Sequence, residues 1–206
     1  MQRIKTIALF SAIVFSAGIL GAYGFSSVSS TLKAQSDMQT AGSVPLLGHV
    51  TLTVRDPEGN VVAYHQGDNT VVTAAENCLS DRIFGIPIAS CPTGGTNPYN
   101  VIGIGNGSGT ASRTDTGLIA EENGDISLRR ATATVQTGTA AGASPVSDVL
   151  QVQFTNAGST NTVTEAGIFN STTYNAPGMF AHQTFTGITL NTGDSLTVKW
   201  TIATGP

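Results

Sequence analysis

The chain is poor in charged residues. Only 11% of its 206 residues are Asp, Glu, Lys or Arg, and its formal net charge is -4. A surface with so little positive charge has no basic face on which a phosphate backbone could be held. The composition therefore argues against nucleic acid as a partner.

Histidine and catalytic motifs are also scarce. His49, His65 and His182 have none of the spacings that metal sites use, and Asp115 with Glu121 supplies too few alternating oxygens for a calcium loop. We expect all three histidines at solvent-facing strand positions. No serine has the flanking glycines of a nucleophile elbow. The sequence therefore predicts a protein that is not an enzyme, with no cofactor, no bound metal and no small-molecule substrate.

Glycine, by contrast, is abundant, with 24 copies. Four of these lie between Gly103 and Gly109, directly after an expected strand at Val101–Ile104. The spacing does not match the dinucleotide-binding fingerprint, no helix follows, and no Lys is placed to meet a phosphate. We interpret the segment as a glycine-rich turn.

The N-terminus has the order of features of a secretory signal peptide. Arg3 and Lys5 precede an uncharged apolar run from Ile7 to Leu20, which small residues such as Gly24 follow. We expect the first 24 residues to be removed and the mature protein to be extracellular, at the cell surface. The apolar run is also nearly long enough to span a bilayer, so a retained membrane helix is the alternative.

Cys78 and Cys91 are the only two cysteines in the chain. An exported protein meets an oxidising environment, in which two cysteines this close in sequence tend to pair. The sequence therefore predicts a disulfide between them.

Alternating apolar and polar residues predict that residues 46–206 form one all-β domain. In the first strand Leu52 and Val54 face one way, and the turn Asp56–Asn60 leads into a second strand. Pairing Val54 with Val62, and Leu52 with Tyr64, would place the larger apolar groups on one face.

One helix is expected in this domain. Thr73 is its predicted N-cap, with Glu76 three residues later in a capping box, and Gly85 ends it. The inner stripe is predicted to hold Ala75, Cys78, Leu79, Arg82 and Ile83.

Further strands are expected in the rest of the chain. In the final strand the core residues should be Leu196, Val198, Trp200 and Ile202. Many short strands with one helix favour a β-sandwich of the jelly-roll or immunoglobulin-like kind. The other strands are predicted at Val101–Ile104, Ile126–Gln136, Val149–Thr155, Thr162–Asn170 and Met179–Leu190.

Residues 25–45 form an N-terminal arm with a strand-like alternation. The even positions include Val28, Leu32, Ala34 and Met38, while the odd positions are polar. This pattern is typical of a strand buried on one side, and it could complete the sheet of a neighbouring subunit as a donor strand. The alternatives are a disordered linker, a short helix, or an edge strand on its own domain.

Two glycosylation sequons are present, at Asn106 and Asn170, and both fall at predicted turns or strand ends. In an exported chain both are candidate sites for glycans.

Several short segments carry a resemblance to known proteins. They include Asp68–Val72, Gly103–Gly107, Asp115–Leu118, Glu165–Phe169 and Gly193–Trp200. The chain resembles exported β-sandwich proteins of archaeal cell surfaces and, more distantly, structural domains of the phage tail-fibre type. The resemblance implies a structural or adhesive role outside the cell, and it implies no catalytic residue.

These features together predict a subunit of a cell-surface filament, a pilus or thread, that polymerises with copies of itself through donor strands. An adhesin or glycan-binding module is the first alternative, and a secreted enzyme is a weaker one. A pilin-like subunit that keeps its N-terminal helix, its only contact with a membrane, is a variant. The lack of a Lys-Gly or Arg-Gly processing site counts against that variant.

We expect thiol labelling of the unfolded, unreduced mature protein to detect no free cysteine. Closing a loop of this size should stabilise the fold by about 3 kcal/mol in the chain-entropy model. Two reactive thiols per chain would contradict the Cys78–Cys91 disulfide.

Overall fold

The computed structural model describes residues 46–84, 98–137 and 146–204. The chain divides into two compact units, Met1–Val44 and Pro45–Pro206, and the described residues all belong to the second. The predicted signal peptide, the arm with Val28, Leu32, Ala34 and Met38, and Cys91 lie outside them. No helix in the described segments is long and apolar enough to cross a membrane.

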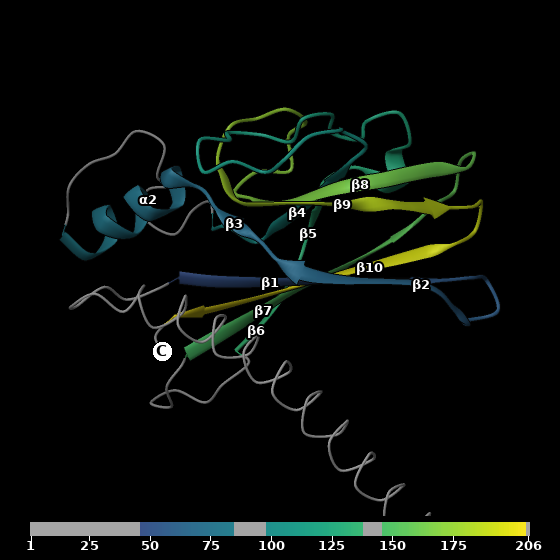
Figure 1. Cartoon of the computed structure of the whole chain (residues 1–206), viewed down its shortest axis with the longest axis horizontal. Helices are drawn as coiled ribbons and strands as arrows, with labels where there is room; N and C mark the ends of the chain where they lie inside the picture. The colour runs from purple at the N-terminus through teal and green to yellow at the C-terminus, as the bar shows by residue number, and fades with distance from the viewer. Residues whose placement is uncertain (1–45, 85–97, 138–145, 205–206) are drawn as a thin grey trace, which may run out of the picture. The chain divides into compact units, whose positions relative to one another are not determined.

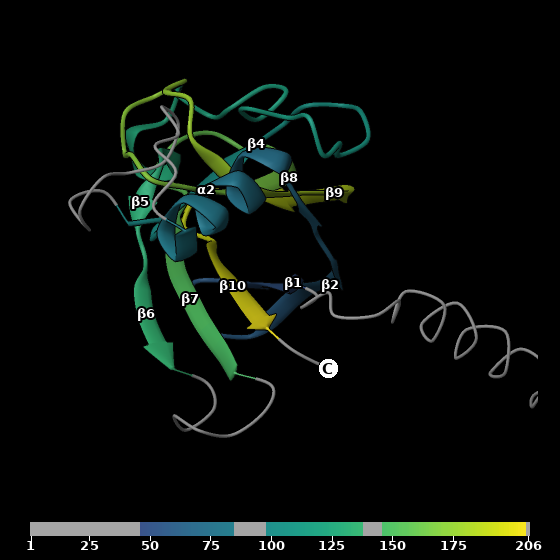
Figure 2. The same cartoon turned by 90° about the vertical axis from the view of Figure 1, so that its left-hand side faces the viewer.

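The domain is an all-β sandwich of two antiparallel five-stranded sheets, which form two layers in Figures 1 and 2. The strand order is β2-β1-β10-β7-β6 in the first sheet and β3-β9-β8-β4-β5 in the second. The first sheet contains β1 (Leu46–Arg55), β2 (Val61–Asp68), β6 (Thr134–Thr137), β7 (Val146–Thr155) and β10 (Ser195–Thr204). The second contains β3 (Thr70–Val71), β4 (Val101–Gly105), β5 (Ala131–Thr132), β8 (Asn161–Phe169) and β9 (Met179–Leu190).

The two sheets share chain segments at both edges. At one edge β2 passes through Asn69 into β3, and at the other β5 passes through Ala133 into β6. The Asn69 N–H still donates to the Gly48 carbonyl of β1, while the next two residues already pair with β9. Each edge strand therefore belongs to the first sheet along part of its length and to the second along the rest.

The prediction of one continuous strand over Ile126–Gln136 was wrong. A 3-10 turn, η2 (Ile126–Leu128), opens this region because the Asp125 carboxylate accepts the Ser127 N–H at 2.8 Å. Leu128 turns into the core with no exposed surface, and Ile126 is left 78% exposed. A side chain that binds a nearby backbone N–H competes with strand pairing, which then begins only at β5.

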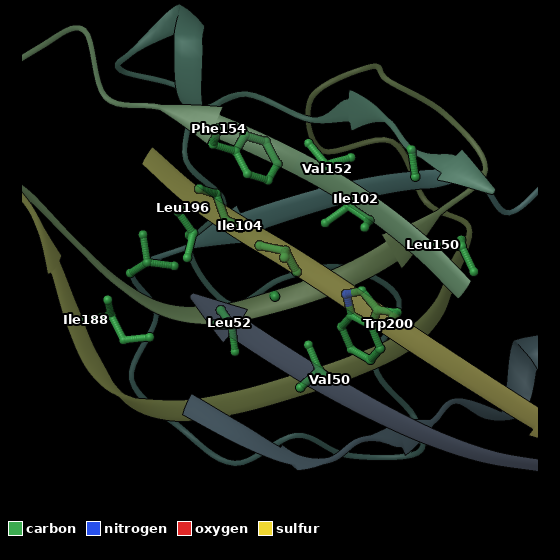
Figure 3. Packing of buried hydrophobic residues seen from close by; sticks show 14 of the residues in the cluster. Val50, Leu52, Ile102, Ile104, Leu150, Val152, Phe154, Ile188, Leu196 and Trp200 are labelled. Atoms are coloured by element: carbon green, nitrogen blue, oxygen red, sulfur yellow. The ribbon is translucent and has the colours of Figure 1, made fainter. Parts of the chain in front are cut away.

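The core lies between the sheets and is built from the inward positions of each strand. Trp200 is fully buried, and its cross-strand neighbours Val50 and Leu150 flank it in Figure 3. Leu196 and Val198 are also fully buried, whereas Ile202 is partly buried at the margin of this cluster. Because side chains alternate between the two faces of a strand, the apolar residues at every second position of β10 bury one of its faces.

The predicted register of the first hairpin was wrong by one residue. Leu52 pairs with His65 and Val54 with Ala63, because a bulge between Val54 and Arg55 shifts the ladder next to the turn. A one-residue shift moves every side chain of a strand to the opposite face. Val62 and Tyr64 therefore point outward and are 55% and 58% exposed.

The helix α2 (Thr73–Phe84) begins at the predicted residue, but its capping box does not form. The Thr73 N–H donates to the Arg113 carbonyl, and the Glu76 carboxylate pairs with the Arg113 guanidinium. Arg113 thus takes both partners of one bond of the box, and the Glu76 N–H, the donor of the other bond, donates to the Val72 carbonyl. Ala75 and Cys78 are buried as predicted, and Leu79 is exposed instead. The side chains of Arg82 and Ile83, and Gly85, lie outside the description.

Replacing Trp200 with Ala should lower the free energy of unfolding by roughly 3 to 5 kcal/mol, since it truncates a fully buried aromatic side chain. Chemical denaturation measures the loss. The neighbouring exposed residue provides the control, and Lys199→Ala should change the same quantity by less than about 0.5 kcal/mol. Equal losses in the two variants would show that Trp200 is not part of the packed core.

Candidate functional site

The outer face of the second sheet is covered by residues 106–130, which we call the cap. The Asn106 N–H donates to the Ala120 carbonyl and the Glu122 N–H to the Ile104 carbonyl, both at 2.9 Å. Leu118 packs into an apolar cluster with Val101 and other residues of this face. Figure 1 shows these loops above β4 and β8.

A buried carboxylate anchors the cap to the sheet. Glu165 on β8 has no exposed surface, and its oxygens accept the backbone N–H groups of three cap residues. The donor nitrogens lie 2.7 to 3.0 Å away and belong to Gly107, Ile119 and Ala120. A fourth contact, from His182 Nε2 on β9, measures 3.0 Å.

His182 joins this carboxylate to a second one in the cap. Its Nδ1 lies 2.7 Å from Asp115 Oδ2, so both ring nitrogens face a carboxylate, and the ring is fully buried. Protonated imidazole is the form that donates from both nitrogens. Asp115, His182 and Glu165 thus form a continuous charge network between the cap, β9 and β8, in which His182 and Glu165 are fully buried and the Asp115 side chain is 24% exposed.

The network shifts the pKa of Glu165 and the pKa of His182 away from their usual values. Burial is the largest influence on Glu165 and raises its pKa, but the hydrogen bonds from His182 and the cap amides together lower that pKa below its usual value. For His182 burial is again the largest influence and lowers the pKa. The hydrogen bonds and negative charges of Glu165 and Asp115 outweigh it, so the pKa of His182 is raised.

A second buried ion pair holds the other end of the cap. Arg130 Nε lies 2.7 Å from Glu121 Oε1, with the two side chains 1% and 2% exposed. The guanidinium also donates to the carbonyls of Ser171 and Ala176, and it lies 3.5 Å from the centre of the Phe169 ring. This pair ties the loop after β8 to the cap.

The glycines of β4 make this close approach possible. A Cβ on Gly105 would lie 2.4 Å from the Ala120 carbonyl oxygen, and one on Gly107 would lie 2.4 Å from Glu165 Oε1. Gly103 and Gly105 lie within a buried strand, so the prediction of a glycine-rich turn was wrong for them. Only glycine leaves room for a second backbone at these positions.

The network can hold structure but is poorly placed for nucleophilic catalysis. Both nitrogens of His182 face carboxylates, so neither is free to take a proton from a hydroxyl or thiol. No group of residues suited to a metal ion is found within the described segments. The expectation of a solvent-facing histidine was wrong for His182, and at His65 the ring packs on Phe185 with its Nε2 buried. His49 is exposed beside Asp68.

The first sheet has an open edge at β2. On one side β2 pairs with β1, and on the other it faces β9 across a groove of about 400 Å³, which we call the β2–β9 groove. The two strands separate here because β3 pairs with β9 only at Ala181 and His182. The groove is lined by residues 62–65, 186–189, Asn191 and Asp194.

A second, more apolar pocket of about 280 Å³ opens where β6 and β7 face β9. Tyr99 and Phe180 stack there with ring centres 5.3 Å apart, and burial raises the pKa of Tyr99. Its other lining residues are Pro98, Asn100, Val135, Asp148, Leu150, Ile168 and Ile202.

The two sequons occupy different environments. Asn106 is exposed at the start of the cap, whereas Asn170 is partly buried with its side chain against Gly178. Glycosylation of either residue stays a prediction. The disulfide also stays a prediction: Cys78 is 6% exposed on α2, and Cys91 lies outside the described residues.

No family model, no curated protein and no solved structure matches the chain. Sequence reasoning missed the buried network, although one signal was present. The glycines at 103, 105 and 107 recur with the period of a strand, which indicates a face with close backbone contact rather than a turn.

We expect the free energy of unfolding to fall as the pH rises above about 6.5, the usual pKa of an unfolded histidine. Because the pKa of His182 is raised in the folded protein, its contribution to the free energy of unfolding is fully present below about pH 6.5. That contribution is lost as the pH rises through the folded pKa of His182. Glu165 has the opposite sign, so its contribution is present above about pH 4.3 and is lost as the pH falls through its lowered folded pKa.

Chemical denaturation of wild type and His182→Gln between about pH 6 and pH 9 measures how the free energy of unfolding changes with pH. This range includes the usual histidine pKa. The fall in stability should be present in wild type and absent in His182→Gln. His49→Gln changes an exposed histidine and should keep the wild-type slope. Identical slopes in wild type and His182→Gln would contradict a raised pKa at His182.

Proposed function

We propose that the protein is a non-enzymatic subunit of an extracellular filament, a pilus or thread on the cell surface, assembled by donor-strand complementation between identical chains. The predicted signal peptide and the alternating arm support export and strand donation. The resemblance to surface β-sandwich proteins of archaea supports a structural role. A jelly-roll or immunoglobulin-like connectivity belongs to the same proposal.

The observation that carries the proposal is the unpartnered edge of β2. Within the described residues, β1 is its only strand partner. Val61, Val62 and Tyr64 on this strand are 51%, 55% and 58% exposed. Edge strands that do not polymerise are commonly protected by lysine, proline or bulges that turn the edge away. β2 contains neither Lys nor Pro, and its bulge lies next to the turn, so from Ala63 to Asp68 it offers a regular row of backbone groups to another strand.

The arm has the composition that such an edge would accept. Burying Val28, Leu32 and Met38 would contribute roughly 1.5 to 3 kcal/mol each, which offsets part of the entropy lost when the arm becomes ordered. An arm from one copy bound to an edge on the next is a head-to-tail contact, and such contacts generate open filaments when the rotation between copies does not close a ring.

An adhesin is the second candidate, and the β2–β9 groove is the feature that favours it. Tyr64 is 58% exposed on β2, and residues with hydroxyl and amide groups, Thr186, Thr189 and Asn191, are among those that line this groove. An aromatic face next to hydrogen-bonding groups is a suitable surface for a glycan. The two candidates compete for the same groove, and assembly of the purified protein distinguishes them.

Deleting residues 28–38 should abolish polymerisation of the mature protein, because the donor strand is lost while the described domain keeps its core. Electron microscopy and sedimentation measure the assembly. Leu32→Asp, on the apolar face of the arm, should have the same effect, whereas Lys33→Asp on the polar face should not. Filaments formed by the deletion variant, or a wild type that stays monomeric at high concentration, would rule out the proposal.

A further inference from the structure

We infer that the acceptor of the donor strand is the free edge of β2, and that residues 28–38 of a second copy extend the first sheet there. This inference rests on the proposed function and adds the acceptor site to it.

The backbone of β2 presents free hydrogen-bonding groups at this edge. The Asn69 N–H donates to the Gly48 carbonyl, so it points toward β1. N–H groups alternate along a strand, and those of Gly67, His65 and Ala63 therefore also point toward β1. The N–H and C=O groups of Tyr64 and Gln66 point away from β1, where β2 has no strand partner among the described segments.

The opposite wall of the groove is a poorer acceptor. In the pairing of β8 with β9, Val163 lies opposite Ile188 and Glu165 opposite Thr184, so β9 has two more residues than β8 across this interval. A bulge bends a strand and interrupts its regular run of hydrogen-bonding groups. β9 therefore cannot offer an unbroken edge, whereas β2 pairs without a shift from Ala63 to Asp68.

The remaining free edge of the first sheet is shorter. β6 has four residues and β2 has eight, against the eleven residues of the alternating arm. Backbone hydrogen bonds supply much of the affinity of strand addition, so the longer regular edge is favoured.

The groove also explains why the arm is apolar on one face only. A strand added to β2 continues the pleat of the first sheet, so alternate side chains point inward over His65 and Ile188, which line the groove. His65 Nε2 is buried there without a hydrogen-bond partner in the described part of the chain, and the His65 ring packs on Phe185. The polar side chains of the arm would lie in line with Tyr64 and Gln66, toward water.

The test is a set of proline substitutions in the full mature chain. Tyr64→Pro removes an N–H from the free edge and leaves the β1 ladder intact, so the critical concentration for assembly should rise about tenfold or more, as expected when a backbone hydrogen bond is lost. Tyr64→Ala removes the same side chain but keeps the N–H, and it should assemble nearly as wild type. Thr186→Pro places the same change on β9 and should also assemble.

Thermal unfolding verifies that each variant is folded, and Gln66→Pro replaces Tyr64→Pro if the latter does not fold. Amide hydrogen exchange of the wild type gives an independent measurement: the Tyr64 and Gln66 amides should become protected on assembly and be unprotected in the monomer. Protection already present in the monomer would overturn the inference, because the edge would then be occupied before assembly.

Normal assembly of Tyr64→Pro, or loss of assembly in Thr186→Pro alone, would overturn the inference. In either case the proposed function survives if deletion of residues 28–38 still abolishes polymerisation. Filaments formed without the arm would remove the proposed function itself, whatever the proline variants show.

Discussion

The buried carboxylate of Glu165 is the interaction on which one whole side of the domain depends. Three amide N–H groups of the cap and one imidazole nitrogen converge on it in a site that water does not reach. An unpaired carboxylate at this depth would be strongly destabilising, and so would the orphaned amides. The cap is therefore bound as a unit, and β4 must carry glycine where the two backbones meet.

The network also divides the sandwich into two unlike sides. The cap covers the second sheet, and the ion pairs of His182 with Asp115 and Glu165 and of Arg130 with Glu121 hold it there. The first sheet ends at β2, whose outer edge has no strand partner among the described residues. At its other edge this sheet ends in β6, which has four residues against the eight of β2.

The side chains that β2 turns toward the groove depend on one irregularity in the hairpin. Without the bulge between Val54 and Arg55, the larger side chains of β2 would point into the sandwich and the smaller ones outward. The bulge reverses this arrangement, so Ala63 and His65 are partly buried on the inner face, while Tyr64 is 58% exposed on the outer face. Space inside the sandwich and a free backbone edge therefore arise at the same place.

The amino-acid sequence by itself determined the class of fold and most of its strands. Alternation over β7 and β10 is a local property, because a strand buried on one side needs apolar residues at every second position. The start of α2 could be read in the same way. Tertiary structure alone decided the hairpin register, the turn at η2, and the place of His182 between Asp115 and Glu165, 67 and 17 residues away in the chain. Each of these depends on which groups, distant in the chain, come into contact when water is excluded. The spacing of residues along one strand does not predict those contacts.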